Sequence, residues 1–165
     1  MADEREDGVV IDHPNRDKAG SKATKAIVIL LLLVSAVLVA IVTIGGWDAQ
    51  GGAQLLSIVY IALYVLMAFF VARWNRGVLP VAAALAIILL IFSAVAAPAW
   101  FDRDKTGFTD PALSAGVVGM FTLIIIPVQL LLIAFAMRGF QQAWNVEVER
   151  HPDSRHGHDG EPALA

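Results

Sequence analysis

One stretch decides the fold of this chain: residues 26–46, which read AIVILLLLVSAVLVAIVTIGG. Fourteen of these 21 residues are Leu, Ile or Val, and none is charged. Because a helix rises about 1.5 Å per residue, a run of this length crosses a hydrocarbon core roughly 30 Å thick. Backbone polar groups in lipid must pair within their own segment, so the run is predicted to be a membrane-spanning helix.

The same stretch is predicted to remain in the mature protein. The apolar core of a cleaved signal peptide is roughly 7–15 residues long. The run at residues 26–46 is longer, and no convincing small-x-small cleavage site precedes Trp47. We therefore expect a retained membrane anchor.

Three further apolar runs follow, at residues 53–72, 78–101 and 112–137. Each has about 20 or more residues without a charge, which is enough to cross a bilayer. The runs are continuous rather than alternating, which excludes the strands of a membrane β-barrel. Short connections make successive helices antiparallel neighbours. The sequence therefore predicts an all-α membrane protein, with a four-helix transmembrane bundle over residues 26–137.

The overall composition agrees with a membrane protein. Hydrophobic residues make up 58% of the chain and charged residues only 16%, whereas soluble domains have about 25% charged residues. The net charge is -3, so no basic face is available for nucleic acid. There is no cysteine, which excludes disulfides and thiolate metal sites. The lipid bilayer is the partner that this composition predicts.

The basic residues predict the orientation of the chain in the membrane. Ten Lys and Arg lie before residue 26, between the second and third runs, or after residue 137. The opposite side has only Arg103 and Lys105. Since basic residues concentrate on the cytoplasmic side, we expect a multi-pass protein of the cell membrane with both termini in the cytoplasm.

Tryptophan positions give a second signal for the same boundaries. Amphipathic indole rings favour the interface between membrane and water. The four tryptophans fall at predicted interfaces and are expected to be anchors there: Trp47 and Trp100 on the outer side, Trp74 and Trp144 on the inner side.

The segments that flank the bundle differ in kind. Residues 1–25 mix both charges and are predicted to be a disordered cytoplasmic tail. Within residues 138–150, Phe140, Trp144 and Val148 recur every four residues, which predicts a short cytoplasmic amphipathic helix. Residues 151–165 are polar and are predicted to be a second disordered tail.

A few polar residues lie inside the spans. Gln129 is the most polar of them, and the second and fourth spans run in the same direction. By depth, Tyr64 lies nearest Gln129, and Tyr60 lies nearest Thr122, which predicts a polar spine of these four residues. Pro127 is expected to kink the fourth span beside it. The spine is either a structural hydrogen-bonded contact between helices or the lining of a path for a small neutral solute.

Chemical signals are scarce. No Asp, Glu, Lys, Arg or His lies within the four runs, although pumps and proton relays normally need one. Asp102, Asp104 and Asp110 match positions 1, 3 and 9 of a calcium loop, but Leu113 stands where a bidentate Glu belongs. A polar turn explains this loop equally well. We expect no catalytic site, no cofactor and no metal.

These features favour a non-catalytic protein that acts through association. The main expectation is an accessory or scaffold subunit of a larger membrane assembly, which binds other membrane subunits or itself. The alternative is a homo-oligomeric channel for a small neutral solute, lined by Tyr60, Tyr64, Thr122 and Gln129. An enzyme acting at the interface through Asp102, Asp104 or His151 ranks last, because these residues lie on opposite sides of the membrane.

Overall fold

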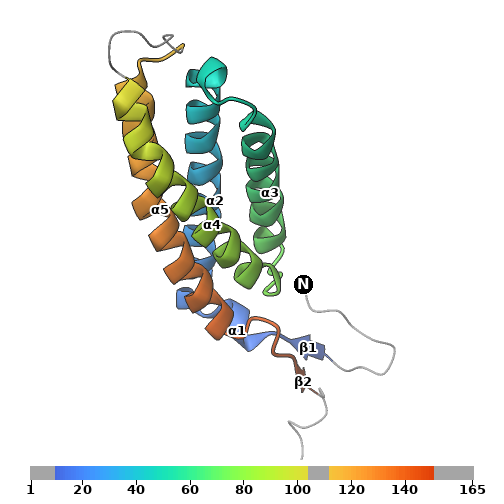
Figure 1. Cartoon of the computed structure of the whole chain (residues 1–165). Coiled ribbons are helices and arrows are strands. Elements are labelled where there is room, and N and C mark those ends of the chain that lie inside the picture. The colour runs from blue at the N-terminus through green and yellow to red at the C-terminus, as the bar shows by residue number, and fades with distance from the viewer. Residues whose placement is uncertain (1–9, 104–111, 151–165) are drawn as a thin grey trace, which may run out of the picture.

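The computed structural model describes residues 10–103 and 112–150. Four long helices make up most of this part of the chain (Figure 1): α2 (Ala19–Gly45), α3 (Gln54–Ala72), α4 (Val78–Arg103) and α5 (Ala115–Gln141). Each is long and apolar enough to cross a membrane. The predicted all-α architecture, with four long apolar helices that could each span a membrane, is therefore confirmed.

The smaller elements lie outside the long helices. A 3₁₀ helix, η1 (Trp47–Ala49), connects α2 to α3. At the other end of the bundle, α1 (Pro14–Asp17) precedes α2, and strand β1 (Val10–Asp12) pairs antiparallel with β2 (Val148–Arg150). Both described ends of the chain therefore lie at the same end of the bundle (Figure 1).

The four helices do not pack evenly around a common axis. Helix α5 runs along both α4 and α2, and α2 runs along α3. Helices α3 and α4 are joined by a short turn, but they touch each other much less and diverge toward the η1 end of the bundle (Figure 1). The bundle is therefore open between α3 and α4.

Small residues allow the close contacts of α4. Ala82, Ala83 and Ala86 are buried on this helix, and α5 presents the buried Gly119 and Ala136. Without a hydrophobic driving force between helices in lipid, close backbone approach at small residues is a main source of association. Larger aliphatic side chains at the α2–α5 contact, such as Leu32 and Leu132, complete the core.

The N-terminal flank differs from the predicted disordered tail. Residues 10–25 form β1, α1 and the first turns of α2. Side chains of α1 hold this segment to the other end of the chain: Asn15 Nδ2 donates to the Ala143 carbonyl at 3.1 Å, and Arg16 Nε donates to the Trp144 carbonyl at 3.0 Å. Residues 1–9 lie outside the described part.

The C-terminal flank also differs from the prediction. The helix expected over 138–150 continues only to Gln141, and the chain then turns and enters β2. Ala143 has a φ of 49°, which breaks the helical path and directs Trp144 back into the core. Burial of this large ring opposes an extended amphipathic helix, which would leave one ring face in contact with water or lipid. Residues 151–165 lie outside the described part.

Candidate functional site

A hydrogen-bonded network crosses the middle of the bundle. Tyr64 Oη donates to Gln129 Oε1 at 2.9 Å, and Gln129 Nε2 donates to Ser35 Oγ at 2.9 Å. Ser35 Oγ in turn donates to the Leu31 carbonyl at 2.7 Å. The network joins α3, α5 and α2, and its three polar side chains are completely buried.

The structure brings two of the four expected spine residues into direct contact. Tyr64 and Gln129 share a hydrogen bond, whereas Thr122 Oγ1 donates to the Val118 carbonyl of its own helix at 2.8 Å. Tyr60 packs edge-on against Tyr64, with ring centroids 5.9 Å apart. Ser35 was missing from the expected spine. Its only sequence signal is a hydroxyl in an otherwise aliphatic stretch.

This network is satisfied within the chain. Both polar atoms of the Gln129 amide have a partner, so burying it avoids the cost of an unpaired group. Neutral hydrogen bonds between membrane helices contribute about 0.6 kcal/mol each on average. The network therefore fixes the relative positions of three helices.

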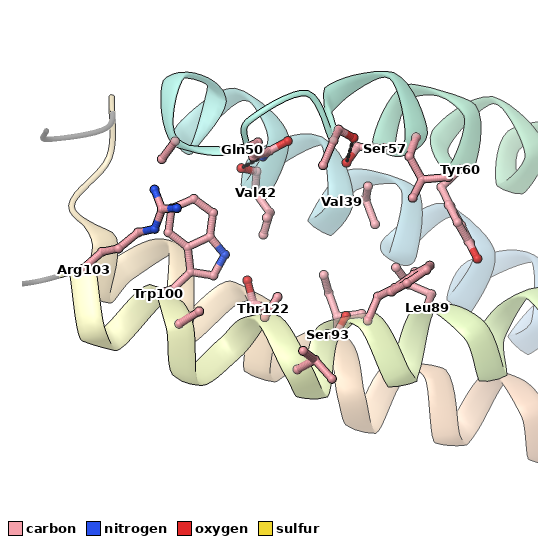
Figure 2. A pocket seen from close by; sticks show the side chains of 18 residues that line it. Val39, Val42, Gln50, Ser57, Tyr60, Leu89, Ser93, Trp100, Arg103 and Thr122 are labelled. Atoms are coloured by element: carbon pink, nitrogen blue, oxygen red, sulfur yellow. Dashed lines mark hydrogen bonds between the residues drawn. The ribbon is translucent and has the colours of Figure 1, made fainter. Parts of the chain in front are cut away.

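A cavity of about 480 Å³ lies between the four long helices, nearer the η1 end (Figure 2). It occupies the space where α3 and α4 diverge. Trp100 and Arg103 of α4 stand at one end, and Tyr60 and Leu89 stand at the other (Figure 2). The lining is largely apolar, with the hydroxyls of Ser93 and Thr122 along its length.

Gln50 is a polar residue of the cavity lining. Its Nε2 donates to the Val42 carbonyl at 2.9 Å, an oxygen that also accepts from the Gly46 N–H, and it lies 3.4 Å from the Thr43 carbonyl. Its Oε1 is buried and has no hydrogen-bond partner among the described residues. This oxygen has almost no accessible surface, so it is enclosed by the protein rather than open to the cavity.

Trp100 forms the floor of the cavity at the same end. The indole is buried against Gly46, and a Cβ on that glycine would lie 2.9 Å from Trp100 Cζ2. The Phe101 ring and the Trp100 Cβ pack closely on Gly119, 3.1 and 3.2 Å from the position that a Cβ on this glycine would take. The Arg103 guanidinium lies 5.6 Å from the centre of the Trp100 ring, within cation–π range. A positive charge is therefore held at the mouth of the cavity.

The four tryptophans divide into two kinds. Trp47 is exposed, and Trp74 is partly buried beneath Lys25, whose Nζ lies 4.0 Å from the ring centre. Trp100 and Trp144, also expected to lie at the membrane interfaces, are buried in the protein. Trp144 packs edge-on against Trp74 at 5.3 Å and has no exposed surface. These two rings are therefore held by packing within the protein.

The remaining predicted positions carry less chemistry. Helix α5 is continuous through Pro127, which lies on its exposed face. Asp102 is exposed near the end of α4, whereas Asp104, Asp110 and His151 lie outside the described residues. Within the described ranges, no group of three or more His, Asp or Glu could hold a metal ion.

Comparison with known proteins gives no relative. No family model matches the chain, and neither a curated protein nor a solved structure matches it. The cavity, the buried network and the paired chain ends are therefore the features from which a function can be inferred.

Proposed function

We propose that this chain is a non-catalytic accessory or scaffold subunit of a larger assembly in the cell membrane, with both termini in the cytoplasm. One observation carries the proposal: the two chain ends form an ordered polar layer at one end of the bundle. We call residues 10–18 and 142–150 the terminal platform. The excess of basic residues at this end supports its cytoplasmic placement.

The terminal platform is attached to the bundle at several points. Trp144 packs edge-on against Trp74, in the turn between α3 and α4, with ring centroids 5.3 Å apart. Gln142 Nε2 donates to Thr24 Oγ1 on α2 at 3.0 Å. A two-stranded sheet alone is marginally stable in water, so these contacts and the buried Trp144 hold β1 and β2 in place. A surface fixed in this way suits a docking role.

The platform also presents apolar side chains. Val146 and Val148 are 43% and 41% exposed, and they lie beside the exposed Asn145 and Glu147. Protein interfaces commonly combine an apolar centre with a polar rim. These valines are therefore the first place where a partner subunit is expected to bind.

The membrane part supports a non-catalytic role. The buried side chains of the network that joins α2, α3 and α5 are neutral, and they satisfy one another. Proton relays and ion-coupled transporters instead rely on ionisable residues within the membrane. The polar residues of this bundle are used to hold helices together.

The geometry favours this proposal over a homo-oligomeric channel. A channel between copies would need the four spine residues to face outward into a shared pore. Tyr64 and Gln129 have no exposed surface, and they bond to each other within one chain. Flux of a neutral solute into liposomes containing the pure protein, lost in Gln129→Leu, would reverse this preference.

Native mass measurement tests the accessory role. The tagged protein would be extracted from its own membrane in a mild detergent and analysed by native gel and mass spectrometry. We expect a stoichiometric foreign subunit with the wild type, and its loss in the double variant Val146→Lys/Val148→Lys. A monomer or homo-oligomer without a foreign subunit would overturn the proposal.

Asn145→Lys is the matched control for that experiment. It adds a positive charge to the same exposed segment but leaves both valines in place. We expect it to retain the partner. Equal loss of the partner in the control and the double variant would show that charge alone disturbs the assembly, and the valines would no longer be the contact.

A further inference from the structure

Part of the wall of the cavity between α3 and α4 lies on the apolar outer surface of the bundle. Three residues that line it, Leu56, Phe92 and Val95, are also among the exposed large apolar residues of the bundle. All three belong to long apolar helices: Leu56 lies on α3, and Phe92 and Val95 lie on α4. A molecule dissolved in the bilayer can therefore enter the cavity from the side.

The polarity of the cavity changes along its length. The Trp100 end carries the Arg103 guanidinium, which lies 5.6 Å from the centre of the Trp100 ring. Away from that end the walls are mainly aliphatic and aromatic, from Val39 to Leu89 (Figure 2). A hydrocarbon chain fits the apolar part, and a negatively charged head group fits the end that carries Arg103.

We propose that this cavity is a binding site for one anionic phospholipid. One of its acyl chains lies between α3 and α4, and its phosphate pairs with Arg103. The acyl chain covers the apolar walls that the divergence of α3 and α4 leaves open.

Two other occupants fit the observations less well. A volume of about 480 Å³ lies in the range of small-ligand sites, about 300–1,000 Å³. A helix about 10 Å across would exceed that volume within two turns, so a helix of a second copy fits the cavity less well than one acyl chain. A purely apolar solute would make no use of the Arg103 charge at the cavity mouth.

Lipid retention by the purified full chain tests the site. The delipidated protein in mild detergent would be mixed with phosphatidylglycerol or phosphatidylcholine of identical acyl chains, and analysed by native mass spectrometry. We expect one phosphatidylglycerol per chain, retained at least tenfold more strongly than phosphatidylcholine. Equal retention of the two lipids by the wild type would overturn the proposal.

Two variants separate the head-group contact from the acyl-chain contact. Arg103→Gln is expected to abolish the preference for phosphatidylglycerol, whereas Arg73→Gln, at the opposite end of the bundle, is expected to keep it. Ala96→Phe fills the cavity and is expected to reduce retention of both lipids. Ala94→Phe puts the same ring on the exposed face of α4 and is expected to change neither.

A second cavity-filling variant keeps the test decisive. Ala99 also lines the cavity and is exposed, so Ala99→Phe replaces Ala96→Phe if the latter does not fold. Loss of lipid in Ala94→Phe equal to that in the cavity variants would overturn the site. A change of oligomeric mass in the cavity variants, with lipid retention unchanged, would assign the cavity to a second copy and would also overturn it.

Discussion

At the scale of single residues, Gln129 determines how the helices meet. Among the described hydrogen bonds, Gln129 is the only side chain of the bundle that bonds to two other helices at once. It bonds to α3 through Tyr64 and to α2 through Ser35. Helices α3 and α5 otherwise have little direct contact. Gln129 therefore links two helices that the rest of the packing leaves apart.

A double-mutant cycle measures that link. We expect Tyr64→Phe and Gln129→Leu to show a coupling of about 0.6 kcal/mol in the free energy of unfolding, because each removes one end of the same hydrogen bond. Reversible unfolding in mixed detergent micelles gives the value. The pair Tyr60→Phe and Gln129→Leu is the control and should be additive; equal coupling in both pairs would contradict the assigned contact.

Glycine at position 46 provides space for Trp100. An added methyl group would meet the indole ring, so Gly46→Ala is expected to lower the free energy of unfolding by about 1–3 kcal/mol. Thermal unfolding followed by tryptophan fluorescence would show the loss. Gly20→Ala is the control, since nothing lies within 4 Å of its Cβ position, and it should stabilise α2 by about 0.5 kcal/mol. Equal effects would contradict the close packing of Trp100 on Gly46.

At the scale of elements, the two flanks of the bundle depend on each other. β1 has no partner strand other than β2 among the described elements, and α1 donates to the carbonyls of Ala143 and Trp144. Removing either flank therefore removes the hydrogen bonds of the other. We expect the terminal platform to form or unfold as one unit.

Cross-linking tests the register of that pairing. Asp12 and Val148 are paired across β1 and β2, and the chain has no other cysteine to compete. Since paired residues in an antiparallel ladder have Cα atoms about 4.5–5.5 Å apart, Asp12→Cys/Val148→Cys is expected to form a disulfide on mild oxidation. Asp12→Cys/Val146→Cys, which is out of register, should form less. The reverse order would indicate a different pairing.

At the scale of the whole molecule, the four helices and the paired ends place residues 10–12 and 148–150 on one side of the bundle. η1 and the end of α4 lie on the other side (Figure 1). The distribution of Lys and Arg then gives the proposed orientation, with the terminal platform in the cytoplasm.

Cysteine labelling in intact cells tests this orientation. A membrane-impermeant maleimide is expected to label Asp48→Cys in η1 and to leave Asn145→Cys unlabelled until the cells are opened. Both positions are exposed in the folded chain, so access differs only by the side of the membrane. Labelling of Asn145→Cys, but not of Asp48→Cys, in intact cells would invert the proposed topology.

The sequence by itself determined the number and the approximate positions of the four long apolar helices. Each helix in lipid must satisfy its own backbone, so length and hydropathy of a local stretch are sufficient to identify it. The same reasoning about depth in the membrane placed Tyr64 near Gln129. It did not include Ser35, because a serine in a helix bonds to its own preceding turn, as Ser35 does with Leu31, without any sign of a second partner.

Only the tertiary structure decided the rest. The burial of Trp144, the pairing of β1 with β2 and the cavity between α3 and α4 all depend on residues far apart in the chain. A four-residue repeat around Trp144 predicts an amphipathic helix locally, but contacts of α1 and Trp74 with the turn after Gln141 replace it. A local sequence pattern shows only the repeat of one helix or strand. Packing between helices sets the direction in which they diverge and the space that this leaves.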